Sequence, residues 1–111
     1  IGEVEDRLCI LADDMIDTGG TICSAAELLY ARGAKEVWAM ATHGVLSGPA
    51  VERLNKSRIS RVVLTNTLPL APEKRIAKFE ILSVAKILAD ALSAVFEDTS
   101  VSDLFGGENQ S

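Results

Sequence analysis

Near its start the chain has nine residues that combine acids, hydroxyl groups and glycines in one short run, Asp13-Asp14-Met15-Ile16-Asp17-Thr18-Gly19-Gly20-Thr21. The paired carboxylates at the front of this run can accept hydrogen bonds from neighbouring sugar hydroxyls, or hold Mg²⁺ against them. Successive glycines let the backbone turn tightly and approach an anion closely. Free N–H groups at a helix start, with two threonine hydroxyls, form a phosphate cradle. The sequence therefore predicts a site for a phosphorylated ribose at Asp13, Asp14, Asp17, Thr18, Gly19, Gly20 and Thr21.

One acid of this run does not suit a pure phosphate cradle. The carboxylate of Asp17 would repel a phosphate, so we expect it to order the loop or to accept a proton or a metal ion. The alternative interpretation is a plain strand-to-helix turn with Thr18 as the N-cap. The occurrence of an apolar strand, three acids and the Thr-Gly-Gly-Thr run together favours the binding site.

The flanking residues predict the strand and the helix that position this loop. Residues 8–12 form a continuous apolar run, which is typical of a strand buried on both faces of a parallel sheet, and the two acids end it. Apolar residues then recur at helical spacing from residue 22 to residue 29, and Gly33 ends the helix. The loop is therefore expected to lie between a fixed strand and a helix N-terminus.

Strand and helix patterns alternate along the rest of the chain. Apolar runs predict strands at residues 36–41, 62–65 and 79–82, while Pro49 can open a short helix and Ser83 can cap a longer amphipathic one. This order predicts an α/β fold with a parallel sheet. Ligands of such sheets lie beyond the carboxyl ends of the strands. Two further polar segments occupy that position: Thr42-His43-Gly44 and Thr65-Asn66-Thr67.

Length and composition exclude several classes of protein. A chain of 111 residues predicts one domain, here residues 1–105, followed by a disordered tail at 106–111. A net charge of −5 argues against sequence-independent binding of nucleic acid.

No apolar run is long enough to span a membrane, and the acidic start does not resemble a signal peptide. The two cysteines have no pairing or metal-ligand spacing, so we expect a reducing cytoplasm. Because the chain starts at Ile1, we expect it to be a piece of a longer protein.

Residues 9–21 resemble the phosphoribosyl diphosphate (PRPP) fingerprint of type I phosphoribosyltransferases. Four later segments make the chain resemble, more narrowly, the ribose-phosphate diphosphokinases, or PRPP synthetases, up to Phe105. They are Ala41-Thr42-His43-Gly44-Val45-Leu46-Ser47-Gly48-Pro49-Ala50, Thr65-Asn66-Thr67-Leu68-Pro69, Leu82-Ser83-Val84-Ala85 and Ser100-Val101-Ser102-Asp103-Leu104-Phe105. The resemblance implies a partial type I phosphoribosyltransferase-like (Rossmann-like) core, corresponding to the C-terminal third of that family.

The resemblance also implies an activity. These enzymes transfer the β,γ-diphosphoryl group of ATP to the C1 hydroxyl of ribose 5-phosphate, giving PRPP and AMP, and rely on positioning and Mg²⁺. They assemble as oligomers, commonly hexamers, with phosphate and ADP as effectors, and Ser100 and Ser102 match a stretch near the regulatory phosphate site. The implied ribose 5-phosphate ligands are Asp13, Asp17, Thr18, Gly19, Gly20 and Thr21, with Asp14 close by.

The family's ATP-binding segments, metal-binding histidine and mobile basic loop have no counterpart in these 111 residues. We therefore expect no catalytic residue in this piece and no activity from it alone. Two rival hypotheses stay open at this point. One is a nucleobase phosphoribosyltransferase, against which the segments after Thr42 argue, and the other is a non-catalytic, PRPP synthetase-associated regulatory subunit.

Other polar residues have weaker signals. His43, the only histidine, is expected to be a satisfied residue of a structural turn rather than a substrate contact. Thr65-Asn66-Thr67 suits substrate contact and loop capping equally. Lys74, Arg75 and Lys78 are expected to form a solvated basic loop.

Overall fold

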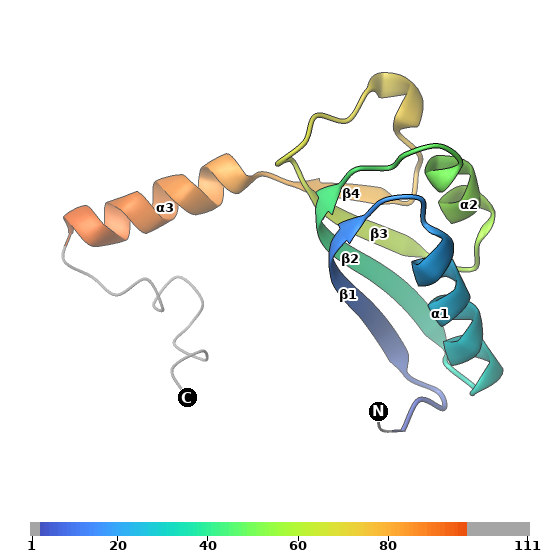
Figure 1. The fold of residues 1–111 in the computed structure, drawn as a ribbon. Helices are drawn as coiled ribbons and strands as arrows, with labels where there is room; N and C mark the ends of the chain where they lie inside the picture. The colour runs from blue at the N-terminus through green and yellow to red at the C-terminus, as the bar shows by residue number, and fades with distance from the viewer. Residues whose placement is uncertain (1–2, 98–111) are drawn as a thin grey trace.

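Four parallel strands form one sheet in the order β1-β2-β3-β4 (Figure 1). The computed structural model describes residues 3–97. A helix follows each of β1, β2 and β4, and a short 3-10 helix lies between β3 and β4. The elements are β1 (Leu8–Ile16), α1 (Gly20–Ala31), β2 (Glu36–Gly44), α2 (Ala50–Lys56), β3 (Arg61–Thr65), η1 (Pro72–Lys74), β4 (Phe79–Leu82) and α3 (Val84–Phe96). The predicted α/β fold with a parallel sheet is confirmed.

Strand β1 is longer than its apolar run. The expectation that the two acids end the strand is wrong, because β1 continues to Ile16 and pairs with β2 up to that residue, at every position except Asp14. Asp13 lies opposite Ala41 and Met15 lies opposite His43 in this register. Backbone pairing with a neighbouring strand does not depend on side-chain polarity, so acidic residues can belong to the strand.

In the described part of the chain, the core lies on one face of the sheet. Alternate residues of the central strands point toward α1 and α2, and successive side chains of a strand lie on opposite faces. The helices contribute Ala26, Ala50 and Leu54 to the same layer, all with 1% or less of their surface exposed. The strand residues of this core are Val37, Ala39, Ala41, Val62 and Leu64.

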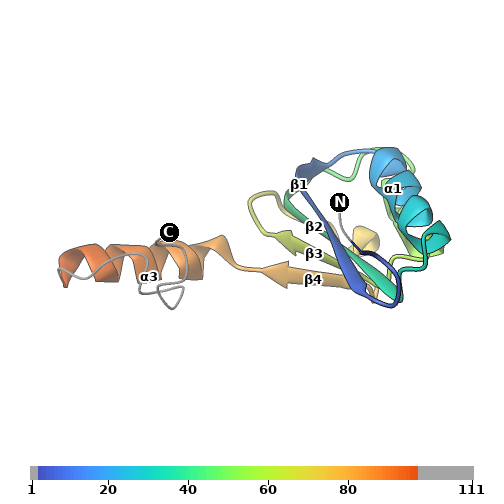
Figure 2. The same cartoon turned by 90° about the horizontal axis from the view of Figure 1, so that it is seen from below.

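No helix covers the opposite face of the sheet in the described part of the chain (Figure 2). Leu8 and Ile10 point to that face and expose 47% and 49% of their surface, so the expectation that β1 is buried on both faces is wrong for residues 3–97. The apolar run predicted burial correctly for the face that the helices cover. It could not reveal that nothing in this part of the chain covers the other face.

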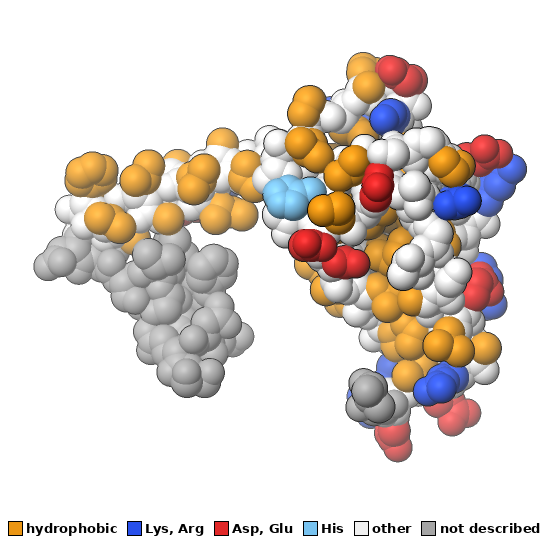
Figure 3. All heavy atoms as spheres, viewed as in Figure 1, with side chains coloured by type: hydrophobic (Ala, Val, Ile, Leu, Met, Phe, Trp, Pro, Cys, Tyr) orange, Lys and Arg blue, Asp and Glu red, His pale blue; other side chains and the backbone are white. Residues whose placement is uncertain are grey.

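Helix α3 extends away from the sheet rather than packing on it (Figures 1 and 2). Its predicted apolar stripe is exposed, as the row of apolar side chains along the helix in Figure 3 shows. Ser83 makes no capping hydrogen bond through its side chain, contrary to expectation. The Asn66 side chain takes that place, since its Oδ1 accepts the Val84 N–H at 2.9 Å. Across residues 3–97 no helix has the length and apolar character to cross a membrane.

The predicted tail at 106–111 and the predicted regulatory residues Ser100 and Ser102 lie outside the described residues.

Candidate functional site

The predicted ribose-phosphate loop lies where β1 ends and α1 begins. A pocket of about 200 Å³ opens there at the carboxyl end of the strand. Of the predicted site residues, Asp14 and Gly20 do not line it. The lining residues are Asp13, Met15, Ile16, Asp17, Thr18, Gly19, Thr21 and Ile22.

Gly19, rather than Thr18, is the N-cap of α1. Its φ of 81° and ψ of −4° are left-handed, and no side chain caps the helix. Glycine adopts this conformation without the steric cost that a Cβ would bring. The Thr18 N-cap of the alternative interpretation is therefore wrong, and no protein side chain caps the N–H groups at the helix start.

The segment after β2 holds the first carbonyl groups of the loop. Val45 and Leu46 both donate their backbone N–H to the Ile16 carbonyl, at 3.1 and 3.0 Å. Ser47 donates its N–H to the Asp17 carbonyl at 2.9 Å. Residues 45–47 therefore hold the start of the loop through backbone hydrogen bonds.

The next two carbonyl groups are also engaged. Arg53 on α2 donates from Nη1 to the Thr18 carbonyl at 3.2 Å. The Gly19 carbonyl accepts the N–H of Cys23 at 3.1 Å as the first bond of helix α1. Every carbonyl from residue 16 to residue 19 thus has a partner within the protein.

The N–H groups of the loop are free by contrast. Within residues 3–97, the backbone N–H groups of Thr18, Gly19, Gly20 and Thr21 donate no hydrogen bond. A trans peptide points its C=O and N–H in opposite directions, so engaged carbonyls turn the N–H groups away from the protein. Together with the positive end of the α1 dipole, these donors favour an anion such as phosphate.

Carboxylates stand beside these donors. The Asp14 N–H donates to Asp13 Oδ1 at 2.7 Å. The pKa of Asp14 lies below its ordinary value, chiefly because of a hydrogen bond with the Asp13 side chain and then one with the Met15 backbone. The Asp17 carboxylate makes no hydrogen bond within the described residues, so an ordering role for its side chain has no support there.

The acids do not form a metal site by themselves. Residues 3–97 contain no group of three or more His, Cys, Asp or Glu that could hold a metal ion. Mg²⁺ is commonly held by one or two carboxylates together with waters and substrate phosphates. Asp13 and Asp14 fit that pattern only if the substrate supplies further oxygen ligands.

Polar residues at the carboxyl ends of β2 and β3 form hydrogen bonds with one another. His43 Nδ1 lies 2.7 Å from Thr67 Oγ1, and Thr65 Oγ1 donates to the Thr42 carbonyl. With the Asn66 cap on α3, these contacts support the structural interpretation of His43 and favour capping over substrate contact for residues 65–67.

Two lysines of the loop that was expected to be solvated form hydrogen bonds with backbone carbonyls of the protein. Lys78 Nζ donates to the carbonyls of Leu54 and Ser57 at 2.8 and 2.7 Å, and so binds the C-terminal end of α2. Lys74 Nζ donates to the Leu46 carbonyl at 3.2 Å. A basic cluster in a loop gives no sequence signal that distinguishes this role from simple solvation.

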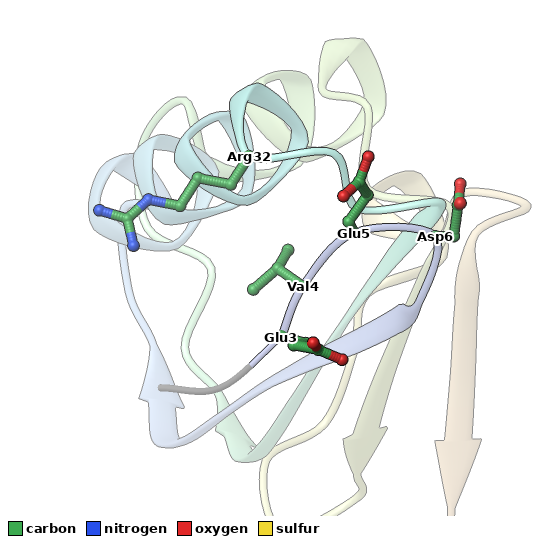
Figure 4. A pocket seen from close by; sticks show the side chains of 5 residues that line it. All are labelled: Glu3, Val4, Glu5, Asp6 and Arg32. Carbon is green, nitrogen blue, oxygen red and sulfur yellow. The ribbon is translucent and has the colours of Figure 1, made fainter.

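A larger pocket, of about 410 Å³, lies before β1 at the opposite end of the strand. Figure 4 shows its acidic side chains and the Arg32 guanidinium pointing in different directions. Three carboxylates and one guanidinium repel a phosphate overall. This pocket is therefore no candidate for the predicted ligand. Its lining residues are Glu3, Val4, Glu5, Asp6 and Arg32.

Comparison with known proteins gives one consistent result. The profile of the phosphoribosyl synthetase-associated domain family matches residues 1–106. A ribose-phosphate pyrophosphokinase of Streptomyces coelicolor is 56% identical over 105 residues, which are 95% of this chain and 32% of that protein. The enzyme of the same name from Mycobacterium leprae is 53% identical over 108 residues, 97% of this chain and 33% of that protein.

A solved structure agrees with these relatives. The crystal structure of phosphoribosylpyrophosphate synthetase from Mycobacterium smegmatis matches with a TM-score of 0.78 and 51% identity. The match covers 88% of this chain and 33% of that one. The chain therefore spans about a third of the length of the relatives it matches, and its fold is that of their corresponding part.

Proposed function

Because the chain belongs to the phosphoribosyl synthetase-associated domain family, we propose that it supplies the ribose 5-phosphate site of a ribose-phosphate diphosphokinase. We call the longer protein of which this chain would be a piece the parent. The parent would transfer the diphosphoryl group of ATP to the C1 hydroxyl of ribose 5-phosphate, giving PRPP and AMP. The observation that carries this proposal is the set of unpaired N–H groups at residues 18–21 beside the carboxylates of β1.

Each predicted residue takes a part in this proposal. The N–H groups of residues 18–21 and the hydroxyls of Thr18 and Thr21 hold the 5-phosphate. Asp13 accepts hydrogen bonds from the ribose hydroxyls, and Asp14 lies beside it. Asp17, whose carboxylate has no partner within the described residues, is free to accept a proton or a metal ion.

The reaction itself needs positioning rather than a protein nucleophile. Mg²⁺ would be held by the carboxylates of Asp13 and Asp14 together with substrate oxygens, and its chemistry is to neutralise charge on the transferring group. The loop fixes the ribose through its phosphate, and so fixes the position of the C1 hydroxyl. The ATP site lies mostly outside this chain in this proposal.

The proposal extends to the parent protein. We place this chain in its C-terminal third, on the support of the segments at residues 41–50, 65–69, 82–85 and 100–105. The parent would be a cytoplasmic homo-oligomer, a hexamer, with phosphate and ADP as effectors acting near Ser100 and Ser102. Truncating the parent after Asp98 should then change its sedimentation or its response to phosphate and ADP.

The direct test is product formation by the full-length parent. Incubation with ATP, Mg²⁺ and ribose 5-phosphate should give equal amounts of AMP and PRPP by ³¹P NMR, with no AMP when ribose 5-phosphate is left out. The 111-residue piece alone should give none. Absence of ribose 5-phosphate-dependent AMP from the parent would overturn the activity.

The same assay separates the rival functions. A nucleobase phosphoribosyltransferase would consume PRPP in the presence of a base and release diphosphate. A regulatory subunit would bind ribose 5-phosphate in a calorimeter without producing AMP. Each outcome is distinct from that of a diphosphokinase.

A further inference from the structure

Arg53 is a cation that reaches the loop from a distant part of the sequence. It lies on the exposed surface of α2, and its Nη1 donates to the Thr18 carbonyl at 3.2 Å. The same nitrogen lies 3.1 Å from where a Cβ on Gly20 would be. Within residues 3–97 its guanidinium takes part in no salt bridge.

The hydrogen bond to Thr18 sets the orientation of one peptide group. With its C=O held by Arg53, the peptide between Thr18 and Gly19 must point its N–H the opposite way. That N–H belongs to Gly19, which is the left-handed N-cap of α1 and one of the unpaired donors. Arg53 therefore helps to aim a donor at the anion without itself lying among the pocket residues.

The charge of Arg53 has a second effect. Asp13, Asp14 and Asp17 place negative charge around the loop, and the chain as a whole carries a net charge of −5. A phosphate bound there is repelled by these carboxylates. Of the cations in residues 3–97, Arg53 is the one that hydrogen bonds to the backbone of the loop, and no carboxylate in that range neutralises it.

We propose that Arg53 is a positioning residue for the phosphate of the ligand, which holds the Thr18–Gly19 peptide and offsets the charge of the neighbouring acids. The inference rests on the proposed ribose 5-phosphate site and adds a determinant of its affinity. It predicts that replacing Arg53 weakens binding of the phosphorylated sugar while leaving the fold and the affinity for ATP unchanged.

Three variants of the full-length parent test this, titrated calorimetrically with ribose 5-phosphate at low and high salt. Arg53→Met should weaken binding on the order of tenfold at low salt, from loss of one hydrogen bond and one nearby charge. The difference from wild type should shrink at high salt, because salt screens an exposed charge. Arg53→Lys keeps the charge and should recover part of the affinity.

Lys56→Met is the matched control. Lys56 lies on the same helix, is exposed, and pairs with Glu52 at 2.7 Å instead of reaching the loop. This variant removes the same charge and should change the affinity by less than about twofold. In steady-state kinetics, Arg53→Met should raise the KM for ribose 5-phosphate and not that for ATP.

Two results would overturn the inference. One is an Arg53→Met variant that binds ribose 5-phosphate as tightly as wild type. The other is an Arg53→Lys variant as weak as Arg53→Met with an unchanged salt dependence, which would assign Arg53 to packing alone. If the wild-type parent binds no ribose 5-phosphate, the proposed function fails instead.

Discussion

Polar side chains follow three neighbouring strands at the same edge of the sheet, but their hydrogen bonds are arranged in opposite ways. Beyond β2 and β3, His43 contacts Thr67, Thr65 donates to the Thr42 carbonyl, and Asn66 caps α3. Beyond β1, the loop has its carbonyls engaged and its N–H groups free. The difference teaches that position at a strand end does not by itself distinguish a candidate site, whereas unused donors do. Mutations should therefore affect ligand binding in the loop after β1 and stability in the segments after β2 and β3.

The largest effect on binding is expected from Gly19→Val. Its left-handed φ of 81° is strained for a residue with a branched side chain, so the loop must change its conformation and misdirect its N–H groups. Loss of two charge-assisted hydrogen bonds would weaken ribose 5-phosphate binding roughly 100-fold or more. Calorimetry on the full-length parent measures this.

Gly33→Val is its control, because Gly33 is also left-handed, with φ of 94°, but follows the far end of α1. It should lower stability and leave the affinity unchanged. Equal affinity losses for the two variants would mean that the loop has no special part in binding.

Thr21→Val should have the next effect on binding. Valine keeps the shape of threonine and removes one hydroxyl, so about 1.5–3 kcal/mol of a charge-assisted hydrogen bond is lost. That corresponds to roughly 10- to 150-fold in affinity. The thermal unfolding midpoint should stay the same, because Thr21 is exposed and its hydroxyl has no protein partner within the described residues.

Asn66→Ala should act on stability instead. It removes the acceptor for the Val84 N–H at the start of α3, and loss of an N-terminal cap costs about 1 kcal/mol. Urea unfolding of the parent checks this, with circular dichroism to follow the helix. An affinity loss as large as that of Thr21→Val would show that residues 65–67 belong to the binding site after all.

The smallest effect is expected for the contact between His43 and Thr67. A double-mutant cycle of His43→Ala and Thr67→Ala should give a coupling energy of about 0.5–1.5 kcal/mol in stability. Neither variant should change the affinity for ribose 5-phosphate. A coupling in binding rather than in unfolding would contradict the division between the two regions.

The sequence was sufficient for the parts of the fold that depend on local patterns. Apolar runs predicted every strand of residues 3–97, and the Thr-Gly-Gly-Thr run located the loop, because turn chemistry and periodicity are properties of neighbouring residues. Of the two successive glycines in that run, it is Gly19 that takes the left-handed conformation. The assignment between two adjacent glycines depends on which carbonyl groups find partners elsewhere.

The parts that sequence could not predict depend on contacts between distant residues. Arg53 reaches the loop across 35 positions, and Asn66 caps a helix that begins 18 positions later. Neither residue is distinguished by its own neighbourhood, since an arginine on an exposed helix and an asparagine in a loop are both ordinary. The exposure of Leu8 and Ile10 likewise depends on what covers the second face of the sheet, which a strand pattern does not reveal.

The support of the loop by later residues also sets an order of events during synthesis. A polypeptide emerges from its N-terminus at about 5–20 residues per second. The loop is made first, but the partners of its carbonyl groups at residues 16–18 come from Val45, Leu46, Ser47 and Arg53. The last of these bonds cannot form until roughly two to seven seconds later, when Arg53 has been added. The loop between β1 and α1 is therefore completed after the strand and helix that flank it have been synthesised.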